Sequence, residues 1–582
     1  MVTTPNALYY GDNLTWLRNH DIFPNDSIDL IYLDPPFNSD ADYNVIFNEP
    51  SGEQSQAQIQ AFDDTWGWEK DACAVALKEL GMAGGKPEVV DYINWIASRG
   101  DGFSKSTAAY LSMMSIRLVE LRRVLKGTGS IYLHCDPTAS HYLKTIMDTI
   151  FGADNFRSEL IWRRTGSNSA AKRFGPIHQT IFYYVKSKLA PYYPVALPYT
   201  KGYIEDYFTE MDEHGRYRPV LLTGPGIRKG DSGKQWRNYD PTSSGRHWQP
   251  SSYLYKKFLK LTEQDLAQYP LLERLDKLDD IGLIHWGKEK DSGVPNYKYY
   301  LEDAPGVLCQ DIWAYQPGTE GCVYGLPEQG IDQDVKWLST KDKERLGYQT
   351  QKPEGLLDRI IKSSSKEKDL VLDPFCGCGT TVASAQKLKR RWIGIDVTWL
   401  AIDKAEKRLK ESYGDKIKKT YFVKGQPVDV ASAKALAKKN KKEFEIWAIS
   451  LVEAAQREHD GGVDGLLSIP ESKKVNTKIV VQVKGGESLN PGMVRDLIGT
   501  VENEKAAIGL LITLEEPTAG MNELANHSGF YESPIWHKKF PRIQIRTVGQ
   551  IFDGKFFELP WGENPGSKAK VAQEQHHQNT LL

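Results

Sequence analysis

The chain lacks the features of several large classes of protein. Its 582 residues include only six cysteines, with no C-x-x-C pair and no secretory leader ahead of them. These absences favour the reducing cytoplasm over a secreted, disulfide-stapled fold. No apolar stretch approaches the length that crosses a bilayer, so no membrane partner is expected. There is no internal repeat, and the formal net charge is only −2.

What is present is length and an uneven distribution of charge. A chain of 582 residues is too long for one hydrophobic core, so roughly two to four domains are expected. From Arg157 to Arg246, 15 lysines and arginines stand against 8 acidic residues, which predicts a basic patch facing an anion. The final segment, 562–582, has the composition of a disordered tail.

One short stretch, IDLIYLDPPF, combines a buried run with an abrupt stop. Ile28 to Leu33 suits a strand buried on both faces of an α/β sheet. Pro35 and Pro36 forbid further ladder pairing. We therefore expect Asp34 and Phe37 in a stiff loop at the carboxyl end of a strand, where open α/β sheets bind ligands.

The rest of the chain contains segments of two kinds, one with clear strand and helix patterns and one with weak helical periodicity and many aromatics. A helical pattern over 110–126 ends at Gly127 and is followed by a strand over 129–136 and a helix over 140–150, which predicts a parallel sheet. From about 155 to 339 helical periodicity is weak and aromatics alternate with cations. That segment suits contact with stacked bases and phosphates, or forms surface loops held by an aromatic mini-core.

The strand-to-helix segment DPFCGCGTT, Asp373 to Thr381, carries the marks of a nucleotide site. Gly377 and Gly379 let the backbone approach a ligand closely, and the helix behind them offers unpaired N–H groups. About fifteen residues later, Asp396 ends the strand WIGID and is placed to accept hydrogen bonds from a ribose diol. Cys376 and Cys378 lack a second pair with metal-ligand spacing, so the loop geometry explains them better than a metal does.

Together, DPPF and FCGCG resemble two motifs of the amino-methylating DNA methyltransferases. These enzymes move a methyl group from S-adenosylmethionine to an exocyclic nitrogen of a base. The order, with the DPPF motif first, a variable block next and the glycine-rich loop last, is similar to the beta arrangement of the family. The resemblance implies a catalytic motif made of Asp34, Pro35, Pro36 and Phe37.

The resemblance also implies a cofactor site. Asp12 of YYGDNL would face the adenine end, the TQKP segment the methionine end, and Asp396 the ribose. The implied cofactor-binding residues are Asp12, Thr350, Lys352, Pro353, Asp373, Phe375, Gly377, Gly379, Thr380 and Asp396.

The implied reaction is the N6 methylation of adenine in duplex DNA by base flipping and direct transfer. The Asp34 carboxylate and the Pro35 carbonyl would accept the two amine hydrogens, and Phe37 would stack on the extruded base. A leading Asp favours adenine N6, whereas the enzymes that act on cytosine N4 more often carry Ser. Cytosine N4 stays open as the alternative.

A third region contains a Gly-rich turn, an acid and a strand bearing Gln-x-Lys. This pattern resembles the Mrr-like branch of the PD-(D/E)xK nucleases. The resemblance implies that Asp464 and Gln482 hold a divalent metal such as Mg²⁺, and that Lys484 orients the attacking water. A strand with a solvated lysine is the alternative, as is a non-cutting DNA clamp.

The predicted fold class is α/β, with a Rossmann-like methyltransferase sheet, an inserted target-recognition region and a C-terminal α/β restriction-endonuclease-like domain. The expected function is site-specific adenine-N6 methylation in a restriction-modification system; a bifunctional or primarily metal-dependent endonuclease is the other alternative. The partner is double-stranded DNA, and a homodimer or a restriction partner is left open. The predicted domains are the catalytic half at 1–154, target recognition at 155–345, the cofactor half at 346–429, the nuclease-like domain at 430–561 and the tail at 562–582.

Overall fold

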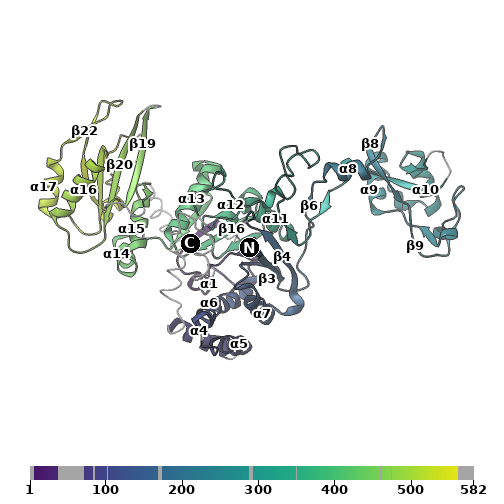
Figure 1. Cartoon of the computed structure of the whole chain (residues 1–582), viewed down its shortest axis with the longest axis horizontal. Coiled ribbons are helices and arrows are strands. Elements are labelled where there is room, and N and C mark those ends of the chain that lie inside the picture. The colour runs from purple at the N-terminus through teal and green to yellow at the C-terminus, as the bar shows by residue number, and fades with distance from the viewer. Residues whose placement is uncertain are drawn as a thin grey trace. The chain divides into compact units, whose positions relative to one another are not determined.

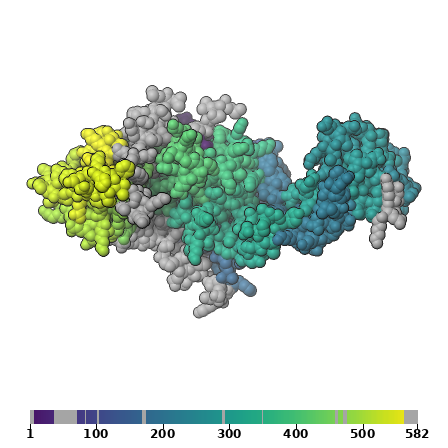
Figure 2. Space-filling view, turned by 90° about the horizontal axis from the view of Figure 1, so that it is seen from above, coloured from purple at the N-terminus to yellow at the C-terminus, as the bar shows by residue number. Residues whose placement is uncertain are grey.

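The structure is a computed structural model whose described parts fall into two compact units (Figures 1 and 2). Unit 1 comprises Met1–Tyr193, Asp311–Ala314 and Asp334–Leu582, and unit 2 comprises Pro194–Gln310 and Tyr315–Gln333. The described residues are 6–36, 71–82, 85–100, 102–167, 174–287, 293–348, 350–457, 462–472 and 475–560.

A nine-stranded mixed sheet forms the centre of unit 1, in the order β14-β4-β5-β3-β2-β15-β16-β1-β17. Its strands pair in parallel except β5, which is antiparallel to both β3 and β4. The α/β prediction is confirmed. The prediction that all strands of the sheet are parallel is wrong for β5. The strands are β1 (Asn6–Tyr10), β2 (Ile28–Leu33), β3 (Leu125–Cys135), β4 (Phe156–Arg163), β5 (His178–Val185), β14 (Ile312–Trp313), β15 (Leu370–Asp373), β16 (Arg391–Asp396) and β17 (Tyr421–Lys424).

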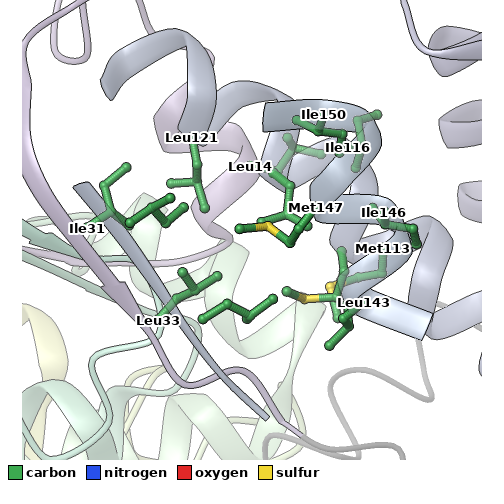
Figure 3. Close-up of a cluster of buried hydrophobic side chains, with 14 of the residues drawn as sticks. Leu14, Ile31, Leu33, Met113, Ile116, Leu121, Leu143, Ile146, Met147 and Ile150 are labelled. Carbon is green, nitrogen blue, oxygen red and sulfur yellow. The ribbon is translucent and has the colours of Figure 1, made fainter. Parts of the chain in front are cut away.

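Helices cover both faces of this sheet (Figure 1). On one face, β2 packs Ile31 and Leu33 against buried side chains of α6 and α7, including Met113 and Met147 (Figure 3). This burial supplies most of the driving force for the layer. The helices of this face are α1 (Asn13–Leu17), α4 (Asp71–Gly81), α5 (Pro87–Ala97), α6 (Gly102–Val124) and α7 (Ser140–Phe151), and those of the other are α11 (Glu354–Ser364), α12 (Thr380–Lys387) and α13 (Trp399–Tyr413).

The predicted elements of this unit agree with the structure in part: α4, α5, β4 and β5 have no counterpart in the prediction, and the helix predicted over 110–126 begins earlier, at Gly102. Strand β2 and helix α7 lie where the periodicity places them. Helix α6 ends at Val124, and residues 125–135 already form β3. Leu125 is fully buried and pairs with Ile28, so the tertiary pairing overrides the local helical pattern.

Unit 2 begins at Pro194, later than the predicted boundary at 155, because β4 and β5 belong to the sheet of unit 1. It contains a four-stranded antiparallel sheet, and Trp236 stacks on Trp286 within its core. We expected weak helical periodicity in this unit, and that expectation is wrong for α9 and α10, which are helices. The elements are β6 (Ala196–Leu197), α8 (Lys201–Tyr207), β7 (Glu210–Asp212), β8 (Gly215–Leu221), β9 (Thr223–Pro225), β10 (Arg246–Trp248), α9 (Ser252–Thr262), α10 (Leu271–Asp280), β11 (Ile284–His285), β12 (Asn296–Tyr300) and β13 (Val307–Leu308).

The C-terminal region of unit 1 has its own five-stranded sheet, in the order β18-β19-β20-β21-β24. Its elements are α14 (Val430–Lys439), α15 (Lys441–Ser450), β18 (Ala455–Gln456), β19 (Gly465–Ser472), β20 (Val475–Lys484), α16 (Pro491–Asn503), β21 (Ile508–Thr513), α17 (Ala519–His527), β22 (Phe530–Glu532), β23 (Lys539–Pro541), β24 (Ile543–Thr547) and α18 (Val548–Phe552). Across the described parts of the chain, no helix is both long and apolar enough to span a membrane.

Candidate active site

The centre of the large sheet brings together the two motifs that lie far apart in the sequence. β2 and β15 are neighbouring parallel strands, with Leu30 opposite Val371 and Ile31 opposite Leu372. From β2 the chain continues to β3 on one side, and from β15 it continues to β16 on the other. Such a point of divergence opens a crevice at the carboxyl ends of the strands, which is where α/β sheets bind ligands.

A pocket lies at this point and contains roughly 360 Å³ of space between its lining atoms, the opening to solvent included. Its walls come from three segments: the end of β2, the stretch 348–352, and the loop between β15 and α12. Of the residues predicted from sequence, the pocket brings together Asp34, Thr350, Lys352, Asp373, Phe375, Gly377 and Thr380. Pro35, Pro36, Pro353 and Gly379 adjoin them in the chain, and Phe37 lies outside the described residues.

One carboxylate oxygen of Asp34 forms an ion pair, and the other has no hydrogen-bond partner among the described residues. Its Oδ2 pairs with the ammonium of Lys352, and its side chain is only 14% exposed. Its Oδ1 is buried and has no hydrogen-bond partner among the described residues. Burial raises the pKa of Asp34, and the Lys352 charge opposes that rise. A buried acceptor without a donor is costly, so Oδ1 is suited to receive a hydrogen from a ligand.

Asp373 lies at the end of β15 and is also fully enclosed. Its carboxylate accepts hydrogen bonds from the Phe375 N–H at 3.0 Å and from the Thr381 hydroxyl at 2.5 Å. Burial raises its pKa to about 7, and the nearby carboxylates Asp34 and Asp396 add to the rise. Asp34 and Asp373 both line the pocket, and Asp396 lies near enough to raise the pKa of Asp373.

The loop after β15 owes its course to two glycines in left-handed conformations. Gly377 has φ +50° and Gly379 has φ +76°. A Cβ on Gly379 would lie 2.7 Å from the Cβ of Ala405 on α13, so a side chain there would clash as well as strain the backbone. The loop therefore passes close to its neighbours and delivers the chain into α12 at Thr380.

Asp396 and Asp12 stand side by side at the ends of β16 and β1, behind the glycine loop. Asp396 accepts from the Gly377 N–H at 3.0 Å and from the Thr398 N–H and hydroxyl at 2.9 Å each, but it does not line the pocket. Asp12 caps α1 by accepting from the Thr15 N–H at 3.0 Å. The Gly11 N–H donates to the Asp396 carbonyl at 2.9 Å, which joins the two loops.

Several residues of this site were not predicted from sequence. Arg117 of α6 pairs with Asp12 and is buried. Tyr32 lines the pocket and shares a hydrogen bond of 2.8 Å with the buried His134. Tyr348 packs 3.0 Å from the position that a Cβ of Gly377 would occupy. A signal existed for Arg117 alone, because it is a cation at a position where the helical period calls for an apolar residue.

The residues singled out in the C-terminal region also lie together. Asp464 accepts from the Val483 N–H at 2.7 Å, and its backbone N–H donates to Val481. Gln482 is 2% exposed, its amide donates to the Gly462 carbonyl, and its Oε1 is buried without a partner among the described residues. Lys484 ends β20 and lowers the pKa of Asp464, which burial raises. The described ranges contain no group of three His, Cys, Asp or Glu side chains that could hold a metal.

A mixed α/β sheet with a ligand pocket at its point of divergence, a glycine-rich loop and a strand-end acid defines the class of Rossmann-like cofactor-binding proteins. Comparison with known proteins gives the family. Residues 28–407 match a family of N6 and N4 methyltransferases described as DNA methylases. Because the match covers more than half of the chain, the protein belongs to this family.

Curated relatives agree with this assignment. The type II methyltransferase M.EcaI of Enterobacter cloacae is 30% identical over 348 residues, which cover 58% of this chain and 67% of that protein. The StyLTI Mod subunit of a type III restriction-modification enzyme, from Salmonella typhimurium, is 27% identical over 391 residues, covering 66% of this chain and 50% of that protein. The chain thus spans only half the length of the second relative. Residues 436–541 are similar to a family described as NACHT-associated inactive restriction endonuclease 1.

The pocket fits S-adenosylmethionine, the cofactor that the family implies. Its acids, Asp34 and Asp373, suit a ligand with a sulfonium and an ammonium charge. Thr350 and Lys352 line the same pocket as Asp34.

Proposed function

We propose that this protein is a site-specific DNA methyltransferase that transfers a methyl group from S-adenosylmethionine to adenine N6 in duplex DNA. The buried, unpartnered Oδ1 of Asp34 beside the glycine-rich loop carries the proposal. A hydrogen from the target amine satisfies that oxygen, and no other group in the pocket has this property among the described residues. Because one curated relative is named as the Mod subunit of a type III restriction-modification enzyme, a role in such a system is part of the proposal.

The chemical difficulty is that an exocyclic amine shares its lone pair with the ring. Asp34 Oδ1 accepts one amine hydrogen and the Pro35 carbonyl accepts the other, which favours the pyramidal nitrogen needed for attack. Bound S-adenosylmethionine supplies the electrophilic methyl group. Asp34 then retains the amine proton that the methylated nitrogen gives up, and Lys352 keeps the Asp34 carboxylate ionised beforehand. Alignment of the reactants supplies much of the acceleration.

The base must leave the duplex to reach this pocket. Extrusion costs a few kcal/mol, which stacking and the hydrogen bonds to Asp34 and Pro35 offset. We assign the stacking role to Phe37, which follows directly on the described part of the DPPF segment. Asp12 and Asp396 hold the adenosine end of the cofactor in this proposal.

Unit 2 is proposed to read the DNA sequence. Its loop between β9 and β10 exposes Arg228 and Lys229, and neither forms an ion pair with any described residue. Exposed cations that form no ion pair, on a unit with an aromatic core, suit contacts with phosphates and bases. The loop is anchored by Trp248, whose indole N–H donates to the Lys234 carbonyl at 2.8 Å.

The test measures transfer of labelled methyl groups into mixed-sequence duplex DNA. The parent is expected to label adenine at N6, and Asp34→Ala is expected to lose roughly 10³-fold or more in kcat. Lys362→Met, on the exposed side of α11, is the matched control. Absence of transfer by the parent, or full activity of Asp34→Ala, would contradict the proposal. Nucleoside analysis of the product distinguishes adenine N6 from cytosine N4.

A further inference from the structure

A glutamate of the C-terminal region reaches the back of the proposed cofactor site. Glu443 lies on α15 and is 9% exposed. Its Oε2 accepts the Trp399 backbone N–H at 2.7 Å and the Tyr10 hydroxyl at 3.0 Å. Tyr10 ends β1 and Trp399 begins α13, so one carboxylate joins the two strand ends that carry Asp12 and Asp396.

The contact with Trp399 replaces a missing helix cap. The first N–H groups of a helix need acceptors, which the side chain at the N-cap position usually provides. Thr398 occupies that position in α13, but its side chain forms no capping bond. Its hydroxyl donates to Asp396 at 2.9 Å instead. Glu443, from another part of the chain, accepts the N–H of Trp399, one of the open donors at the start of α13, and its negative charge suits the positive end of the helix.

Glu443 also has no cation to balance it. No lysine, arginine or histidine of the described ranges forms an ion pair with it, and the Asp396 carboxylate lies near enough to raise its pKa further. A buried carboxylate beside a second carboxylate destabilises a fold, and an apolar side chain would anchor α15 at lower cost. The anchoring role is already served by Ser450, whose hydroxyl accepts the Trp399 indole N–H at 2.7 Å.

We propose that Glu443 is a positioning residue for S-adenosylmethionine: by binding both the Tyr10 hydroxyl and the Trp399 N–H it fixes the start of α13, where Thr398 holds Asp396, so that the fused C-terminal region completes the cofactor site. The inference rests on the proposed function, because it concerns the affinity of the same cofactor. Contacts run without a gap from Glu443 through the Trp399 N–H and Thr398 to the Asp396 carboxylate. Without the Glu443 carboxylate the start of α13 is held less firmly, which weakens the two hydrogen bonds from Thr398 to one carboxylate oxygen of Asp396 and leaves only the Gly377 N–H on the other.

The experiment measures S-adenosylmethionine binding by the full-length chain with titration calorimetry. Glu443→Ala is expected to raise the Kd about tenfold, whereas kcat at saturating cofactor and the KM for DNA stay within about twofold of the parent. Glu443→Gln keeps an amide oxygen for the Trp399 N–H and is expected to restore most of the affinity. Glu445→Ala, on the same helix and paired with Lys442, is the matched control and should leave the Kd within about twofold.

A mutant cycle separates positioning from general destabilisation. Thr398→Val alone is expected to weaken binding about tenfold, and adding Glu443→Ala should weaken it little further, because both act through Asp396. An unchanged Kd in Glu443→Ala, or in Thr398→Val should Glu443→Ala fail to fold, would overturn the inference. If the parent itself binds no S-adenosylmethionine, the proposed function fails first.

Discussion

Among single residues, Lys352 differs most from its expected role. The TQKP segment was predicted to line the methionine end of the cofactor, and Lys352 does line the pocket. Its ammonium pairs with Asp34, the residue proposed above as catalytic. A cation at this place works against the burial of Asp34 and favours the ionised carboxylate that accepts an amine hydrogen.

This contact makes a prediction about pH. Burial raises the pKa of Asp34 and Lys352 lowers it, so removing the lysine raises that pKa further. Activity needs the ionised form, which is present above the pKa and lost as the pH falls through it. Lys352→Met should therefore move the acid limb of the kcat profile to higher pH by about one unit or more. Lys362→Met should not move it, and an unshifted limb in Lys352→Met would contradict the role given to the ion pair.

How far single residues can be predicted depends on how local their role is. Asp34 and Gly377 follow from short motifs, and the structure places both at one pocket. Arg117 and Glu443 could not be found in this way. Each is one charged residue on a helix. Asp12, the partner of Arg117, lies about one hundred positions away in the sequence, and Tyr10, a partner of Glu443, lies several hundred positions away.

At the scale of elements, the strands of the large sheet were easier to predict than the helices of unit 2. β2 is an apolar run interrupted only by Asp29 and followed by Asp34 and two prolines, so its bounds follow directly from sequence. α10 has apolar residues at Leu271, Leu275 and Leu278, a helical spacing. That signal is lost when the whole aromatic stretch is treated as one irregular segment.

The loop between β9 and β10 gives a prediction for an element. Arg228→Ala combined with Lys229→Ala should raise the KM for DNA about tenfold or more and lower the slope of log affinity against log salt by about two. The Kd for S-adenosylmethionine should stay unchanged, because the loop belongs to unit 2. Lys256→Ala, an exposed lysine on α9 of the same unit, is the control. Equal losses in the control and in the loop variant would refute a specific role for the loop.

At the scale of the whole molecule, the predicted meeting of two distant motifs is supported and the nuclease stays a prediction. Asp464, Gln482 and Lys484 lie close together as the resemblance implied. The second acid of the usual nuclease pair is replaced by the neutral Gln482, which weakens attraction for a divalent cation. The related family is moreover described as inactive.

We therefore expect no cleavage of plasmid DNA by the full-length protein with Mg²⁺ at millimolar concentration. Methyl transfer in the same reaction should proceed, and Asp464→Ala should leave it within about twofold of the parent. Supercoiled plasmid analysed on gels measures the first, and label incorporation the second. Cleavage that Asp464→Ala and Lys484→Ala both abolish would instead establish the bifunctional alternative.

The pairing of β2 with β15 also governs how the protein is made. The Leu370 N–H donates to the Asp29 carboxylate across 341 positions of sequence. At typical rates of synthesis, roughly 20 to 70 seconds pass between the appearance of the two strands at the ribosome. Throughout that interval β2 has an open hydrogen-bonding edge and apolar side chains beside it. Until the second half arrives, that edge is open to pairing with other segments of the nascent chain or to binding by a chaperone.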